Sequence, residues 1–207
     1  MNSEQYPSKW LEKAVEELAQ LPGIGRKTAL RLALHLLRQP RESAISLGNA
    51  IIDLRENSGY CQRCHNISDT PLCPICSSPD RVQDVLCVVE NIRDVLAIER
   101  TYQYKGLYHV LGGVISAIDG VGPQNLEIDS LIERIQKEQI KEVIFAISST
   151  IDGETTCYYI YRRLKDFSIR ITQLSRGIAI GDELEYVDEI TLAQAMHDRQ
   201  DMRKTML

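Results

Sequence analysis

Four cysteines carry the clearest chemistry in this sequence. Cys61 and Cys64 form one CxxC pair, Cys73 and Cys76 form a second, and eight residues separate the two pairs. Each CxxC turn presents two sulfur atoms on one side, so two such turns can close a tetrahedron around Zn²⁺. Four protein ligands leave no coordination position open for water. The spacing therefore predicts one zinc ion per chain, with a structural role and no catalytic one.

Other uses of these cysteines fit less well. Disulfides persist in oxidising compartments, and a redox site would use one CxxC motif instead of a matched pair. His65 lies beside a predicted ligand, but the tetrahedron is complete without it. Cys87 and Cys157 fall within a predicted strand and a predicted helix, where we expect them to be small core residues.

A glycine hairpin provides the second signal. In the run LPGIGRK, Gly23 and Gly25 allow the backbone to turn sharply and to approach a ligand closely. The helix that follows begins with free backbone N–H groups and a partial positive charge, which suit a phosphate. Lys27 and Arg31 lie four residues apart and therefore project from one side of that helix, while Arg26 adds charge beside the hairpin. The alternative is an ordinary turn between helices with a solvated basic face.

The distribution of charge supports an anion-binding face despite a net charge of -5. From Leu18 to Arg41 the chain has no acidic residue and five basic ones, whereas Asp182 to Glu189 contains five acidic residues and no basic one. This asymmetry indicates one face for an anion and another for a basic partner. A Rossmann fingerprint does not fit, because Thr28 stands in place of the third glycine, and the chain has no GxxxxGK[ST] motif for ATP hydrolysis.

Carboxylates follow the predicted strands. Glu90 comes directly after the strand VLCVV, and Asp152 and Glu154 follow a later strand. Ligands of α/β sheets gather at the carboxyl ends of strands, and Mg²⁺ prefers oxygen ligands, so the three acids could hold that ion. Alternatively, Asp152 and Glu154 cap and charge the start of the next helix.

Hydrophobic periodicity predicts the elements that position these residues. The spacing predicts helices near residues 11–20, 27–37, 44–57, 91–100, 128–138 and 154–165, a short helix from 192, and strands at 85–89, 108–111, 142–147 and 169–174. Apolar strands that alternate with helices indicate a mainly parallel α/β sheet that is covered on both sides. The segment between the helical start and the sheet has too few large apolar residues to build a core of its own.

Length and composition bound the remaining choices. A chain of 207 residues with 43% hydrophobic and 26% charged residues is an ordinary globular protein, which argues against disorder and coiled coils. No apolar run approaches the roughly 18 to 20 residues that span a bilayer, and the first residues lack an apolar signal core. We therefore expect a cytoplasmic protein that does not bind membranes.

Taken together, these motifs resemble the bacterial recombination mediator family RecR over essentially the whole chain. LPGIGRKTALRLALHLL is similar to its helix-hairpin-helix, the four cysteines to its zinc module, VLCVVEN, DGVGP and STIDGET to its Toprim domain, and RGIAIGDELEYVDEITL to its Walker B-like C-terminal segment. The resemblance implies a multi-part α/β protein with domains at 1–58, 59–80, 81–176 and 177–207. Two positions depart from the family pattern: Arg26 replaces a common proline and Asp152 a more usual glutamate.

The resemblance implies a DNA-binding clamp without enzymatic turnover. Such a protein would form a homo-oligomer, from a dimer to a ring-like tetramer, and would act with RecO and RecF to load recombinase at gapped DNA. By match to the motif, Lys27 and Arg31 would contact DNA. Glu90, Asp152 and Glu154 would bind a partner protein, with RecO as the natural candidate.

Two other functions remain open. Catalytic Toprim enzymes carry an Asp-x-Asp pair that holds Mg²⁺ at the end of a later strand, whereas this chain has Ser148, Ser149 and Thr150 there. A Toprim nuclease or primase-like enzyme would therefore have to use Glu90, Asp152 and Glu154. The third possibility is a zinc-stabilised interaction protein that never touches DNA.

Overall fold

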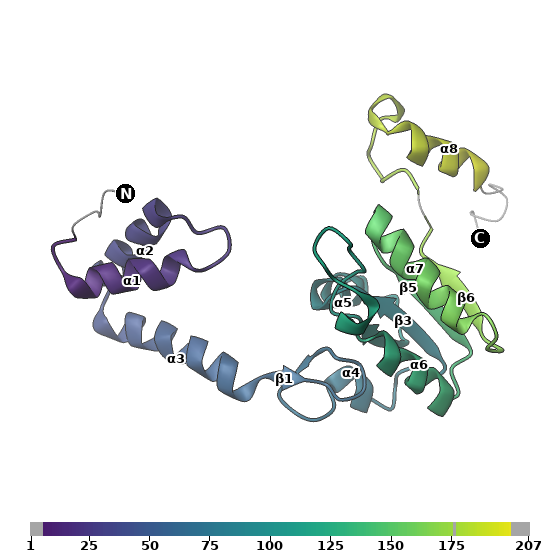
Figure 1. Ribbon diagram of the computed structural model, residues 1–207, viewed down its shortest axis with the longest axis horizontal. Coiled ribbons are helices and arrows are strands. Elements are labelled where there is room, and N and C mark those ends of the chain that lie inside the picture. The colour runs from purple at the N-terminus through teal and green to yellow at the C-terminus, as the bar shows by residue number, and fades with distance from the viewer. Residues whose placement is uncertain (1–5, 176, 200–207) are drawn as a thin grey trace. The chain divides into compact units, whose positions relative to one another are not determined.

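The computed structural model describes residues 6–175 and 177–199 of the chain (Figure 1). It divides into two compact units, one that ends at Gly59 and one that starts at Tyr60. Each unit has a hydrophobic core of its own. The last residue of the predicted Toprim domain, 176, and the end of the predicted C-terminal segment, from 200, lie outside the described residues.

The first unit is helical. It contains α1 (Lys9–Ala19), α2 (Arg26–Arg38) and α3 (Arg41–Asn57). Val15 of α1 packs against Ala29 and Ala33 of α2, and all three are buried. Because alanine side chains are small, the two helices approach closely around the hairpin that joins them. The structure confirms the predicted helix-hairpin-helix.

Helix α3 differs from the other two because none of its residues is buried. It begins at Arg41, directly after Pro40, three residues before the predicted start. Proline fixes its own φ near the helical value and is well tolerated at the start of a helix, which explains the earlier boundary. Five large apolar side chains of this helix are exposed, namely Ile45, Leu47, Ile51, Ile52 and Leu54.

The second unit begins with a small module around the four cysteines. Strand β1 (Gly59–Tyr60), which contains the boundary between the units, pairs with β2 (Ile67–Ser68), and the short helix α4 (Pro74–Ser77) follows. The buried cluster of this module consists of the cysteines themselves, with Ile75 packed against them. As predicted, this segment has no apolar core of ordinary size.

A parallel sheet forms the body of the second unit (Figure 1). Its strands are β3 (Val85–Val89), β4 (Leu107–Val110), β5 (Glu142–Ala146) and β6 (Arg170–Gln173), in the spatial order β4-β3-β5-β6. Its helices are α5 (Ile92–Glu99), the short η1 (Pro123–Asn125), α6 (Ile128–Lys137) and α7 (Ile151–Leu164). All neighbouring strands are parallel.

Helices cover both faces of this sheet. Leu86 and Val88 point to a core shared with α6 and α7, while Cys87 and Val89 point to a core shared with α5. This alternation is the period of two that a strand imposes. Both sides of β3 are therefore apolar, which explains why its sequence is a continuous apolar run. The predicted α/β fold is confirmed.

Beyond the sheet, the chain continues with η2 (Leu184–Tyr186) and α8 (Glu189–His197). Helix α8 starts three residues before the predicted 192, because the side chain of Asp188 caps it by accepting a hydrogen bond from Thr191 N at 2.9 Å. Within the described ranges, every helix is too short or too polar to cross a bilayer.

Candidate functional site

The four predicted zinc ligands lie together. One sulfur atom from each of Cys61, Cys64, Cys73 and Cys76 falls within 4.8 Å of the others, and all four side chains are buried. Backbone N–H groups support the sulfur atoms: Cys73 N donates to Cys61 Sγ at 3.3 Å, and Cys76 N donates to Cys73 Sγ at 3.4 Å. This arrangement fits one tetrahedral ion with four thiolate ligands.

The thiols show why this module needs a cation. Hydrogen bonding to Cys76 and burial raise the pKa of Cys64 far above its usual value, and burial raises that of Cys73 to about 11. At Cys61 burial also raises the pKa, but backbone hydrogen bonds outweigh it and leave the pKa at about 7. Crowded thiolates oppose one another's ionisation, and a bound metal ion removes that opposition.

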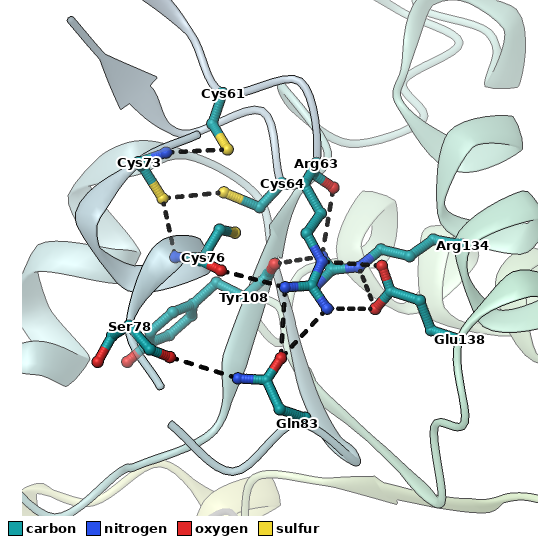
Figure 2. A network of polar contacts seen from close by, with 10 residues as sticks. All are labelled: Cys61, Arg63, Cys64, Cys73, Cys76, Ser78, Gln83, Tyr108, Arg134 and Glu138. Atoms are coloured by element: carbon teal, nitrogen blue, oxygen red, sulfur yellow. Dashed lines mark hydrogen bonds and ion pairs between the residues drawn. The ribbon is translucent and has the colours of Figure 1, made fainter. Parts of the chain in front are cut away.

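An arginine inside the first CxxC turn joins this module to the parallel sheet within the second unit (Figure 2). Arg63 Nε donates to Glu138 Oε1 at 2.8 Å, and its Nη2 donates to Glu138 Oε2 at 2.9 Å. Its Nη1 also donates to the carbonyl oxygen of Cys76 at 3.2 Å. Glu138 lies directly after α6, so this ion pair ties the cysteine module to that helix.

A second arginine completes the connection. Arg134 of α6 is 6% exposed and donates from Nη1 to the carbonyl oxygens of Tyr108 at 2.7 Å and Arg63 at 3.3 Å. Val110 N of the edge strand β4 donates to Cys64 O at 2.9 Å. The module therefore covers an edge of the sheet that would otherwise expose backbone groups. Sequence analysis missed Arg63, Arg134 and Glu138 because no local pattern connects them.

The glycine hairpin has the geometry that its sequence predicts. Ile24 N donates to Leu21 O at 3.0 Å, and Gly23 has φ 79°, which places Pro22 and Gly23 at the central positions of a type II turn. Gly25 precedes α2 without any side-chain cap, and a Cβ atom there would meet nothing within 4 Å. The start of α2 is thus open to close approach by a ligand.

Basic side chains continue from the hairpin along α2. Arg26, Lys27, Arg31 and Arg38 are exposed, and none of them forms an ion pair with a residue that the structure describes. A shallow groove of about 390 Å³ runs along this helix. It is lined by Lys27, Leu30, Arg31, Leu34, His35 and Arg38. The predicted pair Lys27 and Arg31 therefore shares one surface, which we call the α2 groove.

Glu90 lies at the carboxyl edge of the sheet, as predicted, and has a specific partner. Its Oε1 accepts a hydrogen bond from Ser148 N at 2.5 Å and a second one from Ser148 Oγ. Ser148 is the first residue of the run Ser148, Ser149 and Thr150, where the Toprim resemblance of the sequence leads us to look for an Asp-x-Asp pair. Both donors of this serine, its backbone N–H and its hydroxyl, are directed at Glu90.

The two later acids lie in the first turn of α7, which begins at Ile151 and not near 154. Thr150 caps the helix: its Oγ1 accepts from Gly153 N at 3.1 Å, a role that the sequence offers, as one alternative, to Asp152 and Glu154. Gly153 packs so closely on Ser148 that an added Cβ would lie 2.0 Å from the Ser148 carbonyl oxygen. Glu154 Oε1 accepts from Gln173 Nε2 at 3.4 Å.

The predicted acids share an edge but do not converge on one point. Among the described residues, the four cysteines are the one group of three or more potential ligands close enough to hold a metal ion. Glu90, Asp152 and Glu154 therefore form an acidic edge, a name we use for these three residues.

Family models match the chain in the order that the motifs suggest. A RecR helix-hairpin-helix model matches residues 11–55, and a RecR model of a zinc finger with four cysteines matches 59–78. A Toprim domain model matches 84–175, and a RecR C-terminal model matches 177–200. The cysteine site thus coincides with a zinc finger of that family, and zinc is the ion that it binds.

Relatives match almost the full length. A recombination protein RecR of Porphyromonas gingivalis is 59% identical over 198 residues, which cover 96% of each chain. Proteins of the same name from Bacteroides thetaiotaomicron and Flavobacterium johnsoniae are 57% and 53% identical, and these matches cover 95% and 97% of this chain and 96% and 98% of theirs. The chain belongs to the RecR family of recombination proteins.

Proposed function

We propose that this protein is a non-catalytic DNA-binding clamp and adaptor in recombinational repair. The observation that carries the proposal is the α2 groove, in which Lys27 and Arg31 lie beside an open helix start without ionic partners among the described residues. Side chains whose charge is not neutralised within the protein attract phosphates strongly. The two residues are separated by four positions, about 6 Å along the helix axis, which suits neighbouring phosphates of one strand.

One such groove offers few contacts, so the proposal includes a homo-oligomer, from a dimer to a ring-like tetramer. Helix α3 supports it. With 3.6 residues per turn, its exposed apolar side chains share one half of the helix together with Arg55, while Ser46, Asp53 and Asn57 lie on the other half. A second copy of this chain would cover the apolar half. Several grooves in one assembly would raise DNA affinity through multivalency.

The proposed partners are RecO and RecF, with which the protein would help to load recombinase at gapped DNA. The acidic edge supports a contact with RecO, because Glu90 follows β3 and Asp152 and Glu154 lie in the first turn of α7, so that all three carry negative charge at the carboxyl edge of the sheet. Electrostatic complementarity with a basic protein surface would make the encounter fast and sensitive to salt.

A combined binding and cleavage assay tests the proposal. Labelled gapped DNA is titrated with the protein in Mg²⁺ or Mn²⁺, fluorescence anisotropy follows binding, and a denaturing gel examines the DNA afterwards. The proposal predicts saturable binding with intact DNA. Metal-dependent cleavage or synthesis that disappears in Glu90→Gln would overturn it and identify a Toprim enzyme instead. Absence of DNA binding would leave a zinc-stabilised interaction protein.

A further inference from the structure

Two isoleucines are exposed at the carboxyl edge of the parallel sheet. Ile118, in the loop after β4, is 95% exposed, and Ile151, the first residue of α7, is 87% exposed. Because β4 and β5 both run parallel to β3, the loop after β4 and the start of α7 lie at the same edge (Figure 1). An exposed isoleucine by itself needs no explanation, but two on one edge that also carries acids indicate a surface for a partner.

The loop that carries Ile118 is well supported. Ser116 and Val121 form an antiparallel bridge whose two N–H···O distances are 2.9 and 2.8 Å. Ser116 Oγ also donates to Asp119 Oδ2 at 2.9 Å. Ile115 and Val121 of the same loop pack against the core. Ile118 is therefore the apolar tip of a fixed loop.

The backbone that carries Ile151 is also held in place by local contacts, and its helix is hydrogen-bonded to the loop that carries Ile118. The Thr150 cap and the close packing of Gly153 fix the first turn of α7. Ile115 N, in the loop, donates to Thr156 Oγ1 of α7 at 2.8 Å. A partner that covers both isoleucines would lose little free energy in ordering this surface, which favours tight association.

Charge defines the chemistry of that partner. Residues 112–122 and 148–155 contain Asp119, Asp152 and Glu154 but no basic residue. Glu90 adds a fourth acid at the end of β3, and Arg93 in the first turn of α5 is the basic residue closest to it in sequence. Among the described residues named here, the edge thus combines two apolar tips with four acids and one arginine, so its charge is negative. The complementary surface is an apolar recess surrounded by basic side chains.

We propose that Ile118 and Ile151 are the apolar anchors of a protein–protein interface at this edge. This inference rests on the proposed function, which assigns protein binding to the acidic edge. The acids steer the encounter, whereas the isoleucines bury apolar area in the complex and slow its dissociation.

Binding kinetics against purified RecO of the same bacterium, measured by biolayer interferometry at several salt concentrations, test the proposal. Ile118→Ser and Ile151→Ser should each raise the dissociation rate about tenfold, with little change in the salt dependence. Glu154→Gln should instead lower the association rate and flatten the salt dependence. Tyr102→Asn is the control, because Tyr102 is 80% exposed and lies between α5 and β4, at the opposite edge of the sheet. It should dissociate as the parent does.

The outcomes separate the inference from the proposed function. If Glu154→Gln weakens binding while the double isoleucine variant binds as the parent does, the isoleucines are not anchors. The proposed role of the acidic edge in partner binding is then retained. If the parent fails to bind RecO, or if neither type of variant changes the binding kinetics, both the isoleucine anchors and the proposed RecO contact are refuted. A double isoleucine variant with reduced oligomeric mass in light scattering would make this edge a contact between copies of the chain and would also overturn the inference.

Discussion

Arg63 and Glu138 are 75 residues apart in sequence, yet their side chains form a two-pronged ion pair with N–O distances of 2.8 and 2.9 Å. Arg63 lies between two zinc ligands, and Glu138 lies at the end of α6. The zinc module and the parallel sheet are therefore parts of one structure. Loss of the metal ion should lower the stability of the sheet. A substitution that destabilises the sheet should in turn weaken metal binding.

Zinc content is the simplest prediction. Purified protein should contain one zinc ion per chain, and Cys61→Ser or Cys76→Ser should lose the metal and lower the melting temperature, because metal binding contributes folding free energy. Cys87→Ala is the matched control, since Cys87 is a buried thiol outside the site. It should lose packing energy but keep its zinc. Elemental analysis that finds no zinc in the parent would refute the assignment.

Removal of the charge of Glu138 should weaken both the zinc module and the sheet. Glu138→Gln should lower the free energy of unfolding by about 2 kcal/mol, because charge-assisted hydrogen bonds from two arginines are lost. It should also speed zinc release to a chelator. Glu133→Gln, which breaks an exposed pair with Lys137 on the same helix, should cost less than about 0.5 kcal/mol. Equal effects of the two variants on unfolding would contradict the coupling.

The ion pair between Arg63 and Glu138 should make the free energy of unfolding depend on pH. Burial raises the pKa of Glu138, but hydrogen bonds and charge from Arg63 and Arg134 outweigh it and hold the pKa below its usual value. A carboxyl whose folded pKa is depressed contributes stability above its unfolded pKa of about 4.3, and this is lost as pH falls through the folded value. Denaturant unfolding from pH 6 to 3 should therefore show a shallower loss of stability in Glu138→Gln than in the parent.

Gly153 should stabilise the junction between β5 and α7. Gly153→Ala would place a Cβ 2.0 Å from the Ser148 carbonyl oxygen, and the shift needed to relieve this clash should cost about 1 to 3 kcal/mol. It should also disturb the Glu90–Ser148 contact. Gly177→Ala, with nothing within 4 Å of the added atom, should have almost no effect on thermal unfolding. A Gly153→Ala variant as stable as the parent would contradict this packing.

The elements that the sequence predicted well are those with a local signal. The continuous apolar run of β3 and the helical spacing of α1 have one interpretation each, and the spacing of the four cysteines is specific in itself. The start of α7 was predicted three residues late because Thr150, not an acid, supplies the cap. The Arg63–Glu138 pair could not be predicted, since it depends on how two distant segments pack.

The oligomer should depend on the apolar half of α3. Ile51→Glu replaces an apolar side chain of that half by an acid and should reduce the mass measured by light scattering. The smaller species should bind DNA much more weakly, because it loses multivalency. Ser46→Glu adds the same charge on the opposite half and should leave the mass unchanged. A loss of mass in Ser46→Glu but not in Ile51→Glu would place the contact on the polar half.

The salt dependence of DNA binding tests the central claim most directly. Lys27→Ala/Arg31→Ala is compared with Lys9→Ala/Lys13→Ala, a pair with the same spacing and charge on α1. On duplex DNA, each lost phosphate contact reduces the slope of the logarithm of the DNA association constant against the logarithm of the salt concentration by about 0.9. The slope of the α2 variant should therefore be smaller than that of the parent by about 1.8 per bound chain. The α1 variant should keep the slope of the parent. An unchanged slope in the α2 variant, or an equal loss in both, would contradict DNA binding through the α2 groove.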